Sequence, residues 1–192
     1  MKYKKGVLFQ TSWKFFAYQN TVITISKIAR INIKNSFHFF ERWTSKDPFF
    51  SLFYMGDNSS FYVEGAFIIY TGSRVYINKG ATLNLGSGYI NNNLNLSCFE
   101  NITRGNNVAI SENVTIRDSD NHTILDGRHV KTQPVTIGNN VWIGANVTIL
   151  KGVHIGDGSI IAAGSVVTAN IPVNVLAAGV RAHVIRTNVR WE

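Results

Sequence analysis

An aliphatic side chain recurs at every sixth position through the second half of the chain, at Ile137, Ile143, Ile149, Ile155, Ile161 and Val167. Three places after each stands Gly or Asn, the residues that enter left-handed backbone conformations at least cost, namely Asn140, Asn146, Gly152, Gly158, Gly164 and Asn170. One place further stands a small or branched side chain, at Val141, Val147, Val153, Ser159, Ser165 and Ile171. A period of six is far from the 3.6 of a helix, and this window is rich in poor helix formers.

The repeat predicts short strands separated by tight corners, with the aliphatic side chains directed into a narrow core. Turns of this kind stack into an all-β architecture, the hexapeptide parallel β-helix. The same phase recurs upstream at Ile77 and Leu83, with Gly80 and Gly86 at the corner position. A second phase runs through Ile110 and Ile116, with a corner at Asn113.

The repeat is interrupted between Ile116 and Ile137, which are 21 residues apart, or three hexapeptides and three further residues. The interrupting segment, 117–134, is polar and carries several titratable side chains. We therefore predict a loop inserted into the β-helix. Excursions from a rigid scaffold often carry function.

We predict one domain in three parts. Residues 1–60 form a basic, aromatic-rich N-terminal segment, residues 61–187 form the β-helix with its inserted loop, and residues 188–192 form a tail. Alternating apolar and polar residues over 21–34 predict strands, which either begin the β-helix or cap its end.

Composition excludes intrinsic disorder, because 45% of the 192 residues are hydrophobic and 16% are charged. No apolar run approaches the ~18 residues of a membrane-spanning helix, and no secretory signal is evident, so we expect a cytoplasmic protein. Cys98 is the single cysteine, which we expect to be a small buried hydrophobic residue.

Positive charge is concentrated in the N-terminal segment. Residues 1–60 hold nine Lys or Arg against three acidic residues, within a net charge of +8. Such a patch favours anionic partners. No nucleic-acid-binding motif accompanies it, so we expect no nucleic-acid partner and favour a solvated rim or peripheral contact of residues 1–46 with a membrane surface.

His122 is the strongest candidate for chemistry, because imidazole can take a proton from a hydroxyl and return it to a leaving group. Asp118 and Asp120 stand close enough in sequence for one of them to fix its tautomer. A zinc site would need three protein ligands, for which the candidates are His122, His129 and His154. His154 closes its hexapeptide and is expected to point outward, so we expect no metal. Trp142 has the same position in its hexapeptide, and we expect it to project outward beside the inserted loop.

Two stretches carry a resemblance to a known family. Pro134 to Arg186, beginning PVTIGNNVWIGANVTI, closely resembles the hexapeptide-repeat O-acetyltransferases of galactosides, maltose and nodulation sugars. Together with IRDSDNHTI, Ile116 to Ile124, it is most similar to the branch that acetylates capsular or exopolysaccharide sugars. The resemblance covers roughly residues 75–187. It implies a left-handed β-helix, a homotrimer, active sites between neighbouring subunits, and acetyl-CoA lying along the coil.

The resemblance also implies roles for individual residues. His122 matches the general base, and Asn91 matches an asparagine that holds the acceptor or acetyl group. Trp142 matches a wall of the pantetheine and acceptor cleft. The remaining matches are backbone contacts to the pantetheine arm at Ala145 and Ala163, and contacts near the adenosine phosphate at Thr168 and Arg186. Arg181 replaces the usual Pro and Ala169 the usual basic residue, so Arg181 is a further candidate for the phosphate.

These observations predict acetyl transfer from acetyl-CoA to a sugar hydroxyl by direct attack, with His122 as base, Asp120 and Asn91 in support, and a backbone amide at Gly144 or Ala145 stabilising the oxyanion. N-acetylation of an amino sugar would use the same residues. A carbonic anhydrase of the gamma class and a non-catalytic scaffold are the alternatives from other classes. The acceptor is left open between a free, nucleotide-linked or lipid-linked sugar of polysaccharide biosynthesis.

Overall fold

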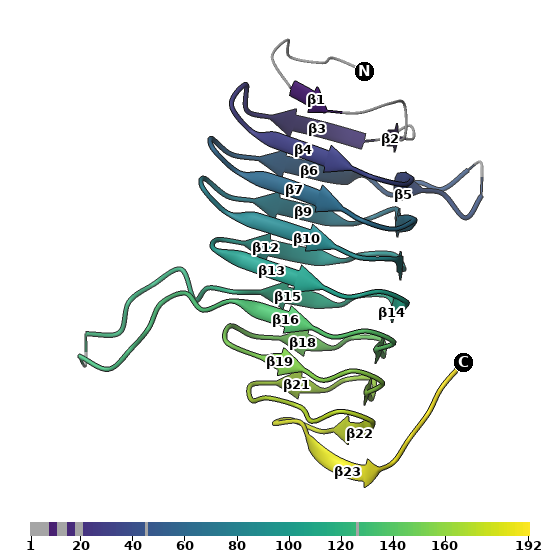
Figure 1. Ribbon diagram of the computed structural model, residues 1–192, viewed down its shortest axis with the longest axis vertical. Coiled ribbons are helices and arrows are strands. Elements are labelled where there is room, and N and C mark those ends of the chain that lie inside the picture. The colour runs from purple at the N-terminus through teal and green to yellow at the C-terminus, as the bar shows by residue number, and fades with distance from the viewer. Residues whose placement is uncertain (1–7, 11–14, 18–20, 45, 126) are drawn as a thin grey trace.

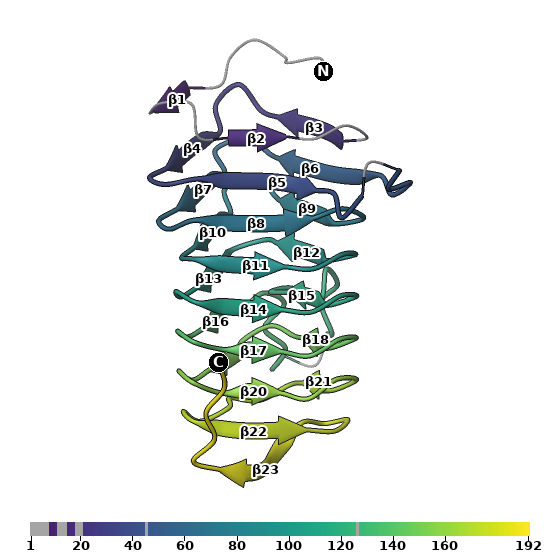
Figure 2. The same cartoon turned by 90° about the vertical axis from the view of Figure 1, so that its right-hand side faces the viewer.

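The chain coils into a left-handed parallel β-helix with three faces (Figures 1 and 2). The computed structural model describes residues 8–10, 15–17, 21–44, 46–125 and 127–192. Among the described residues, strands pair in parallel throughout the coil, except that the last strand, β23, is antiparallel to its neighbour β22. The predicted all-β architecture is confirmed.

Three sheets, here called A, B and C, form the faces. Sheet A contains β1 (Leu8–Gln10), β4 (Arg30–Ile33), β7 (Ser60–Val63), β10 (Thr82–Leu85), β13 (Asn101–Arg104), β16 (Val135–Ile137) and β19 (His154–Ile155). Sheet B contains β2 (Phe15–Ala17), β5 (Phe37–Glu41), β8 (Phe67–Tyr70), β11 (Gly88–Ile90), β14 (Val108–Ile110), β17 (Trp142–Ile143), β20 (Ile160–Ile161), β22 (Val175–Ala178) and β23 (His183–Thr187). Sheet C contains β3 (Thr21–Ile25), β6 (Ser51–Met55), β9 (Arg74–Ile77), β12 (Asn95–Cys98), β15 (Thr115–Arg117), β18 (Thr148–Ile149) and β21 (Val166–Val167).

The chain visits the sheets in the order A, B, C, so each turn has an A–B, a B–C and a C–A corner. Sheet C lies between the B–C corner and the C–A corner. Two corners carry long excursions, residues 42–50 at a B–C corner and residues 118–134 at a C–A corner. Figure 1 shows them projecting on opposite sides of the coil.

The core of the C-terminal turns is the predicted aliphatic ladder. The six residues from Ile137 to Val167 at every sixth position are at most 1% exposed. Their partners four places on, from Val141 to Ile171, are at most 2% exposed. Cys98 is buried as expected. The N-terminal turns are instead filled by phenylalanines, and Phe37, Phe39, Phe53, Phe61 and Phe67 are fully buried.

The predicted corners are largely confirmed. Positive φ angles of 54–73° occur at Asn140, Asn146, Gly152, Gly158 and Gly164, and also at Gly80 and Asn113. Gly86 and Asn170 also lie at corners, as predicted, but without positive φ. A Cβ on Gly86 would lie 2.3 Å from the carbonyl oxygen of Gly105, so glycine is needed there for close stacking. Asn170 instead accepts a hydrogen bond from the amide of His154 through Oδ1 at 2.8 Å.

The strands over residues 21–34 are turns of the coil itself. Thr21 lies beside Ser51 in sheet C, and Arg30 lies beside Ser60 in sheet A. The basic residues Lys2, Lys4, Lys5 and Lys14, on which the expected membrane contact largely depends, lie outside the described residues. Within the described ranges, no helix is long and apolar enough to cross a membrane.

The C-terminal tail turns back along the coil. Trp191 donates from Nε1 to the carbonyl oxygen of Asn140 at 2.7 Å, and its ring lies 6.2 Å from that of Trp142. Figure 2 shows the C-terminus beside β17, two strands back from β22 in sheet B.

Candidate active site

The insertion is a hairpin that projects from the C–A corner between β15 and β16. Its stem joins 118–120 to 131–133. The amide of Asp120 donates to the carbonyl of Lys131 at 3.0 Å, the amide of Gln133 donates to that of Asp118 at 2.9 Å, and Ser119 bridges to Thr132 in antiparallel fashion. The tip, 121–130, carries His122.

Asp118 fixes the root of this hairpin. Its buried carboxylate accepts hydrogen bonds from the amides of Phe99, Glu100 and Asn101 at 2.7–2.9 Å. These amides belong to the C–A corner of the preceding turn. The expectation that Asp118 could orient His122 is therefore not met, because its oxygens are used to hold the corner and to place the stem upon it.

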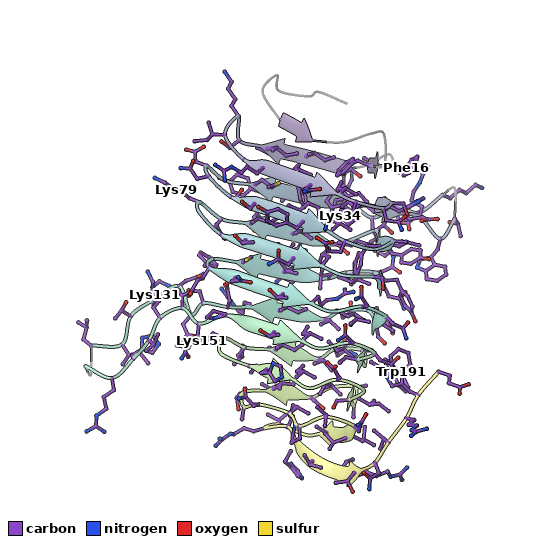
Figure 3. All side chains as sticks on the ribbon, in the orientation of Figure 1. Phe16, Lys34, Lys79, Lys131, Lys151 and Trp191 are labelled. Carbon is purple, nitrogen blue, oxygen red and sulfur yellow. The ribbon has the colours of Figure 1, made fainter. Side chains whose placement is uncertain are left out.

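Like Asp118, Asp120 contacts residues other than His122. Its Oδ2 lies 2.8 Å from Nε2 of His129 and 2.5 Å from Nζ of Lys151. Two hydrogen bonds lower the pKa of the Asp120 carboxyl, and the bond from Lys151 has a larger effect than the bond from His129. Figure 3 shows Lys151 where the hairpin leaves the coil.

His129 connects the two chain segments that flank His122. Its Nδ1 accepts a hydrogen bond from the amide of Ile124 at 3.0 Å. In a neutral imidazole the proton then resides on Nε2, which donates to Asp120. Since Asp120 and Ile124 stand two residues before and after His122, one nearly buried imidazole restrains both sides of the exposed candidate base.

Trp142 projects outward from sheet B, as expected, with 43% of its surface exposed. The register places it in one row with Ala109 and Tyr89. Ala109 is only 5% exposed between these two larger side chains. In this row a small residue thus lies between two aromatic rings.

A second row, two residues further along each strand, contains Asn91, Ser111 and Gly144. The amide of Asn91 donates to Ile110 of β14, and that of Ser111 donates to Ile143 of β17, both at 2.8 Å. On the C-terminal side of Asn91 the row consists of the small residues Ser111 and Gly144. A Cβ on Gly144 would lie 2.6 Å from the amide nitrogen of Ala163, so close stacking requires glycine here.

The amides at this corner differ in their availability. The amide of Gly144 donates to Ile161 at 2.8 Å, so the prediction that it could bind an oxyanion is wrong. Among the described residues, the amides of Ala145 and Ala163 have no hydrogen-bond acceptor, while the following amides of Asn146 and Gly164 donate to the turn above. Two unpaired donors on consecutive turns, beside small side chains, suit a chain of amide carbonyls such as pantetheine.

The candidate phosphate contacts lie elsewhere. Thr168 follows β21 at the C–A corner, and Arg181 and Arg186 are exposed at the C-terminal end of the coil, Arg186 within β23. Sheet C separates Thr168 from Ala145 and Ala163, which lie at the B–C corner, so one copy of the chain does not bring these three residues together. Arg181 instead follows Val180, which pairs with Val166 at the start of β21, and Arg186 pairs with Leu176 of β22 in sheet B.

The site residues thus fall into two groups on opposite sides of one protomer. The hairpin half-site comprises His122, Asp120 and Thr168 at the C–A corner. The face half-site comprises Asn91, Trp142, Ala145 and Ala163 on sheet B and its B–C corner. The expectation that Trp142 lies beside the insertion is wrong within one chain, since Trp142 packs against Trp191, which Figure 3 shows on the side away from Lys151.

One feature of the face was not predicted. The excursion 42–50 places Trp43 on Tyr70, with ring centroids 4.4 Å apart and planes 9° from parallel. Tyr70 is the direct neighbour of Asn91 in register, since Ile69 pairs with Ile90. The sequence feature that could have indicated this contact is a cluster of aromatic residues, Trp43, Phe49 and Phe50, in a stretch without the six-residue repeat.

Known proteins share both the repeat and the coil. Residues 134–169 match the family described as bacterial transferase hexapeptide (six repeats). The galactoside O-acetyltransferase of Escherichia coli is 45% identical over 116 residues, which are 58% of this chain and 57% of that protein. That of Lactococcus lactis is 42% identical over 104 residues, 52% and 50% of the two chains. The alignments thus span about half the length of these relatives. The resemblance to hexapeptide-repeat acetyltransferases is confirmed.

Solved structures extend the similarity to the N-terminal turns. The polySia-specific acetyltransferase NeuO is 28% identical, with a TM-score of 0.58 over 93% of this chain and 83% of that one. The polysialic acid O-acetyltransferase OatWY, at 22% identity and a TM-score of 0.53 over 93% and 90%, shares the fold.

Proposed function

We propose that this hexapeptide-repeat protein, a homologue of galactoside O-acetyltransferases, transfers the acetyl group of acetyl-CoA to a hydroxyl of a sugar. The observation that carries the proposal is the arrangement of the two half-sites. An exposed histidine stands on a braced hairpin, and the opposite side of the coil offers Asn91, an exposed indole and two unpaired amides. Each half lacks what the other supplies.

We further propose that the working unit is a homotrimer in which the hairpin of one copy meets sheet B of the next. A ring of identical contacts closes the same pair of surfaces three times. The exposed apolar tip of the hairpin supports this, because Ile124 is 61% and Leu125 96% exposed in the single chain. Apolar side chains beside a catalytic group favour a buried contact over a solvated one.

His122 removes the proton of the acceptor hydroxyl as its oxygen attacks the thioester carbonyl. The new carbon–oxygen bond forms, the carbon–sulfur bond then breaks, and the proton passes from His122 to the departing thiolate. In this mechanism the amide of Ala145 donates to the oxygen that becomes negative in between, a contribution on the order of 3 kcal/mol, and the amide of Ala163 is left for a carbonyl of the pantetheine arm. Asn91 orients the acceptor, and Arg181 and Arg186 supply charge for the phosphates of CoA.

The acceptor that we propose is a sugar or oligosaccharide of polysaccharide biosynthesis, presented in the cytoplasm in free, nucleotide-linked or lipid-linked form. Two relatives are named for galactosides, and the NeuO structure is named for polySia, so saccharides are the shared chemistry of these names. The basic N-terminal segment supports work close to an anionic membrane surface, where each basic residue adds about 1 kcal/mol of attraction.

The test measures CoA release from acetyl-CoA with a panel of free and nucleotide-linked sugars. We expect His122→Ala to lower sugar-dependent turnover by about 10²–10⁴-fold while acetyl-CoA still binds in calorimetry. His154→Ala is the matched control, because His154 is an exposed, outward-facing histidine of sheet A. Normal turnover by His122→Ala, or no affinity of the wild-type protein for CoA, would contradict the proposal.

A further inference from the structure

We propose that Trp43 and Tyr70 form a platform for a second sugar ring of the acceptor, next to the sugar that reacts near Asn91. This inference rests on the proposed function and deepens it. It predicts that the natural acceptor contains at least two linked sugars.

The indole of Trp43 is exposed yet held rigidly. One face lies against Tyr70 at 4.4 Å, and its edge donates from Nε1 to Oδ1 of Asn92 at 2.6 Å. Trp43 nevertheless remains 60% exposed. A large apolar ring kept in water is unfavourable unless something covers it, and a ring that is already fixed loses little entropy when it binds.

The excursion that carries the indole is anchored to the same corner. Asn92 donates from Nδ2 to Oγ1 of Thr71 at 3.0 Å, and the hydroxyl of Thr71 donates to the buried carboxylate of Asp47. Asp47 in turn accepts a hydrogen bond from the amide of Phe49 at 3.0 Å. Both ends of the excursion are therefore tied to the residues that neighbour Asn91, so the position of the ring is fixed relative to Asn91.

The chemistry of the surroundings selects the occupant. A pyranose ring offers one face of C–H groups that packs on an aromatic ring and an edge of hydroxyls for amide side chains. Here Tyr70, on which the indole of Trp43 is stacked, neighbours Asn91 in register at a strand spacing of about 4.8 Å, and the indole edge is hydrogen-bonded to the next residue, Asn92. Gly144 and Ala145 lie at the other end of the same row, toward the C-terminus. The acetyl donor and the remote sugar would thus approach Asn91 from opposite directions.

The test is calorimetric binding of saccharides to the full-length assembled protein without CoA. The probes are a sialic acid series and a galactose series, each of one, two and four sugars. We expect one series to bind more tightly with length, and Trp43→Ala to weaken the four-sugar ligand about tenfold, or about 1.4 kcal/mol, while leaving the single sugar unchanged. Trp43→Phe, which keeps a ring, should lose less.

Phe50→Ala is the matched control, because Phe50 is an even more exposed aromatic of the same excursion. It should leave the affinity for every length unchanged. The platform is overturned if neither series binds better with length, if Trp43→Ala weakens one and four sugars equally, or if it dissociates the assembly. Acetyl transfer to a single sugar is measured separately, so a failed platform and a failed proposed function give different results.

Discussion

The carboxylate of Asp120 meets the imidazole of His129 at 2.8 Å, and the same imidazole accepts the amide of Ile124 at 3.0 Å. These two contacts enclose His122 in a short loop of fixed shape. Asp120 therefore positions the candidate base His122 indirectly, because it holds His129, which in turn holds the backbone that carries His122. Lys151, from the coil itself, completes the cluster by holding Asp120 at 2.5 Å.

Replacing this second histidine should slow catalysis without unfolding the coil. We expect His129→Phe to lower kcat about 10–100-fold, by analogy with the loss of a residue that orients a metal-binding histidine, with KM for acetyl-CoA unchanged. His129→Gln, whose carbonyl can still accept the Ile124 amide, should recover part of the loss. Equal kcat in His129→Phe and the wild type would show that the clamp does not position His122.

The clamp should also fail in acid. The pKa of Asp120 is lowered in the folded protein, so its pairing stabilises the hairpin above the ordinary pKa of an aspartate and is lost as the pH falls through the lowered value. We expect amide protection factors in the hairpin tip to show a step that falls below about pH 4 as Asp120 is protonated. Asp120→Asn should abolish this acid-dependent step. A step of equal size in that variant would assign it to another group.

The six-residue repeat predicts the C-terminal turns because each of these turns consists of hexapeptides without additional residues. Thr136 pairs with His154, so that turn takes 18 residues, or three hexapeptides. Ser60 pairs with Thr82 after 22 residues and Arg30 with Ser60 after 30. Extra corner residues break the phase there, and buried phenylalanines replace the aliphatic ladder. For the N-terminal turns, the sequence therefore predicts only strands, from the alternation of apolar and polar residues, and not the β-helix itself.

The sequence names candidate residues for the site but does not predict their contacts. His122 follows from its place in a polar break of the repeat. The partners of Asp118 and Asp120 do not, because they depend on which corner the hairpin rests upon. The face of the coil that carries Trp142 also could not be predicted, because it depends on how many corners the chain makes between residues 134 and 142. Trp43 was missed because no periodicity connects residues 42–50 with Asn91.

Leu125 should contribute to assembly rather than to the fold of the single chain. It is 96% exposed at the hairpin tip, so Leu125→Ser removes no contact within the described chain. If the tip is buried against the next copy, the loss of its apolar surface weakens each contact by about 1–2 kcal/mol. We expect a measurable shift toward monomer in sedimentation at low concentration. Val22→Ser, which removes a 53%-exposed side chain of β3, is the control and should leave assembly unchanged.

Arg104 is a cost to stability that a substitution can remove. It is 3% exposed, its guanidinium lies 4.0 Å from the ring of Phe67, and Nε and Nη1 have no hydrogen-bond partner among the described residues. Burial lowers the pKa of this guanidinium well below its usual range. We expect Arg104→Met to stabilise the protein by about 1–3 kcal/mol. Thermal unfolding would show this as a higher midpoint, and a lower midpoint would mean that the charge is compensated.

The division of the site between two copies makes a quantitative prediction for mixed assemblies. One chain carries His122→Ala, which spoils the hairpin half-site, and the other carries Asn91→Ala with Trp142→Ala, which spoils the face half-site. Each homotrimer should be inactive. In a random equal mixture, a cleft works only where an intact hairpin meets an intact face, so about one quarter of wild-type turnover should return.

The mixture is made by refolding or co-expressing the two chains, and turnover is measured as CoA release with the acceptor that supports the wild type. Mixing the same variants after assembly, without subunit exchange, is the control and should restore nothing. A site contained in one protomer would behave differently, because every copy would keep one defect and no mixture could recover activity. Recovery therefore separates the two architectures, since only a cleft between a hairpin and a neighbouring face can combine the intact halves of two defective chains.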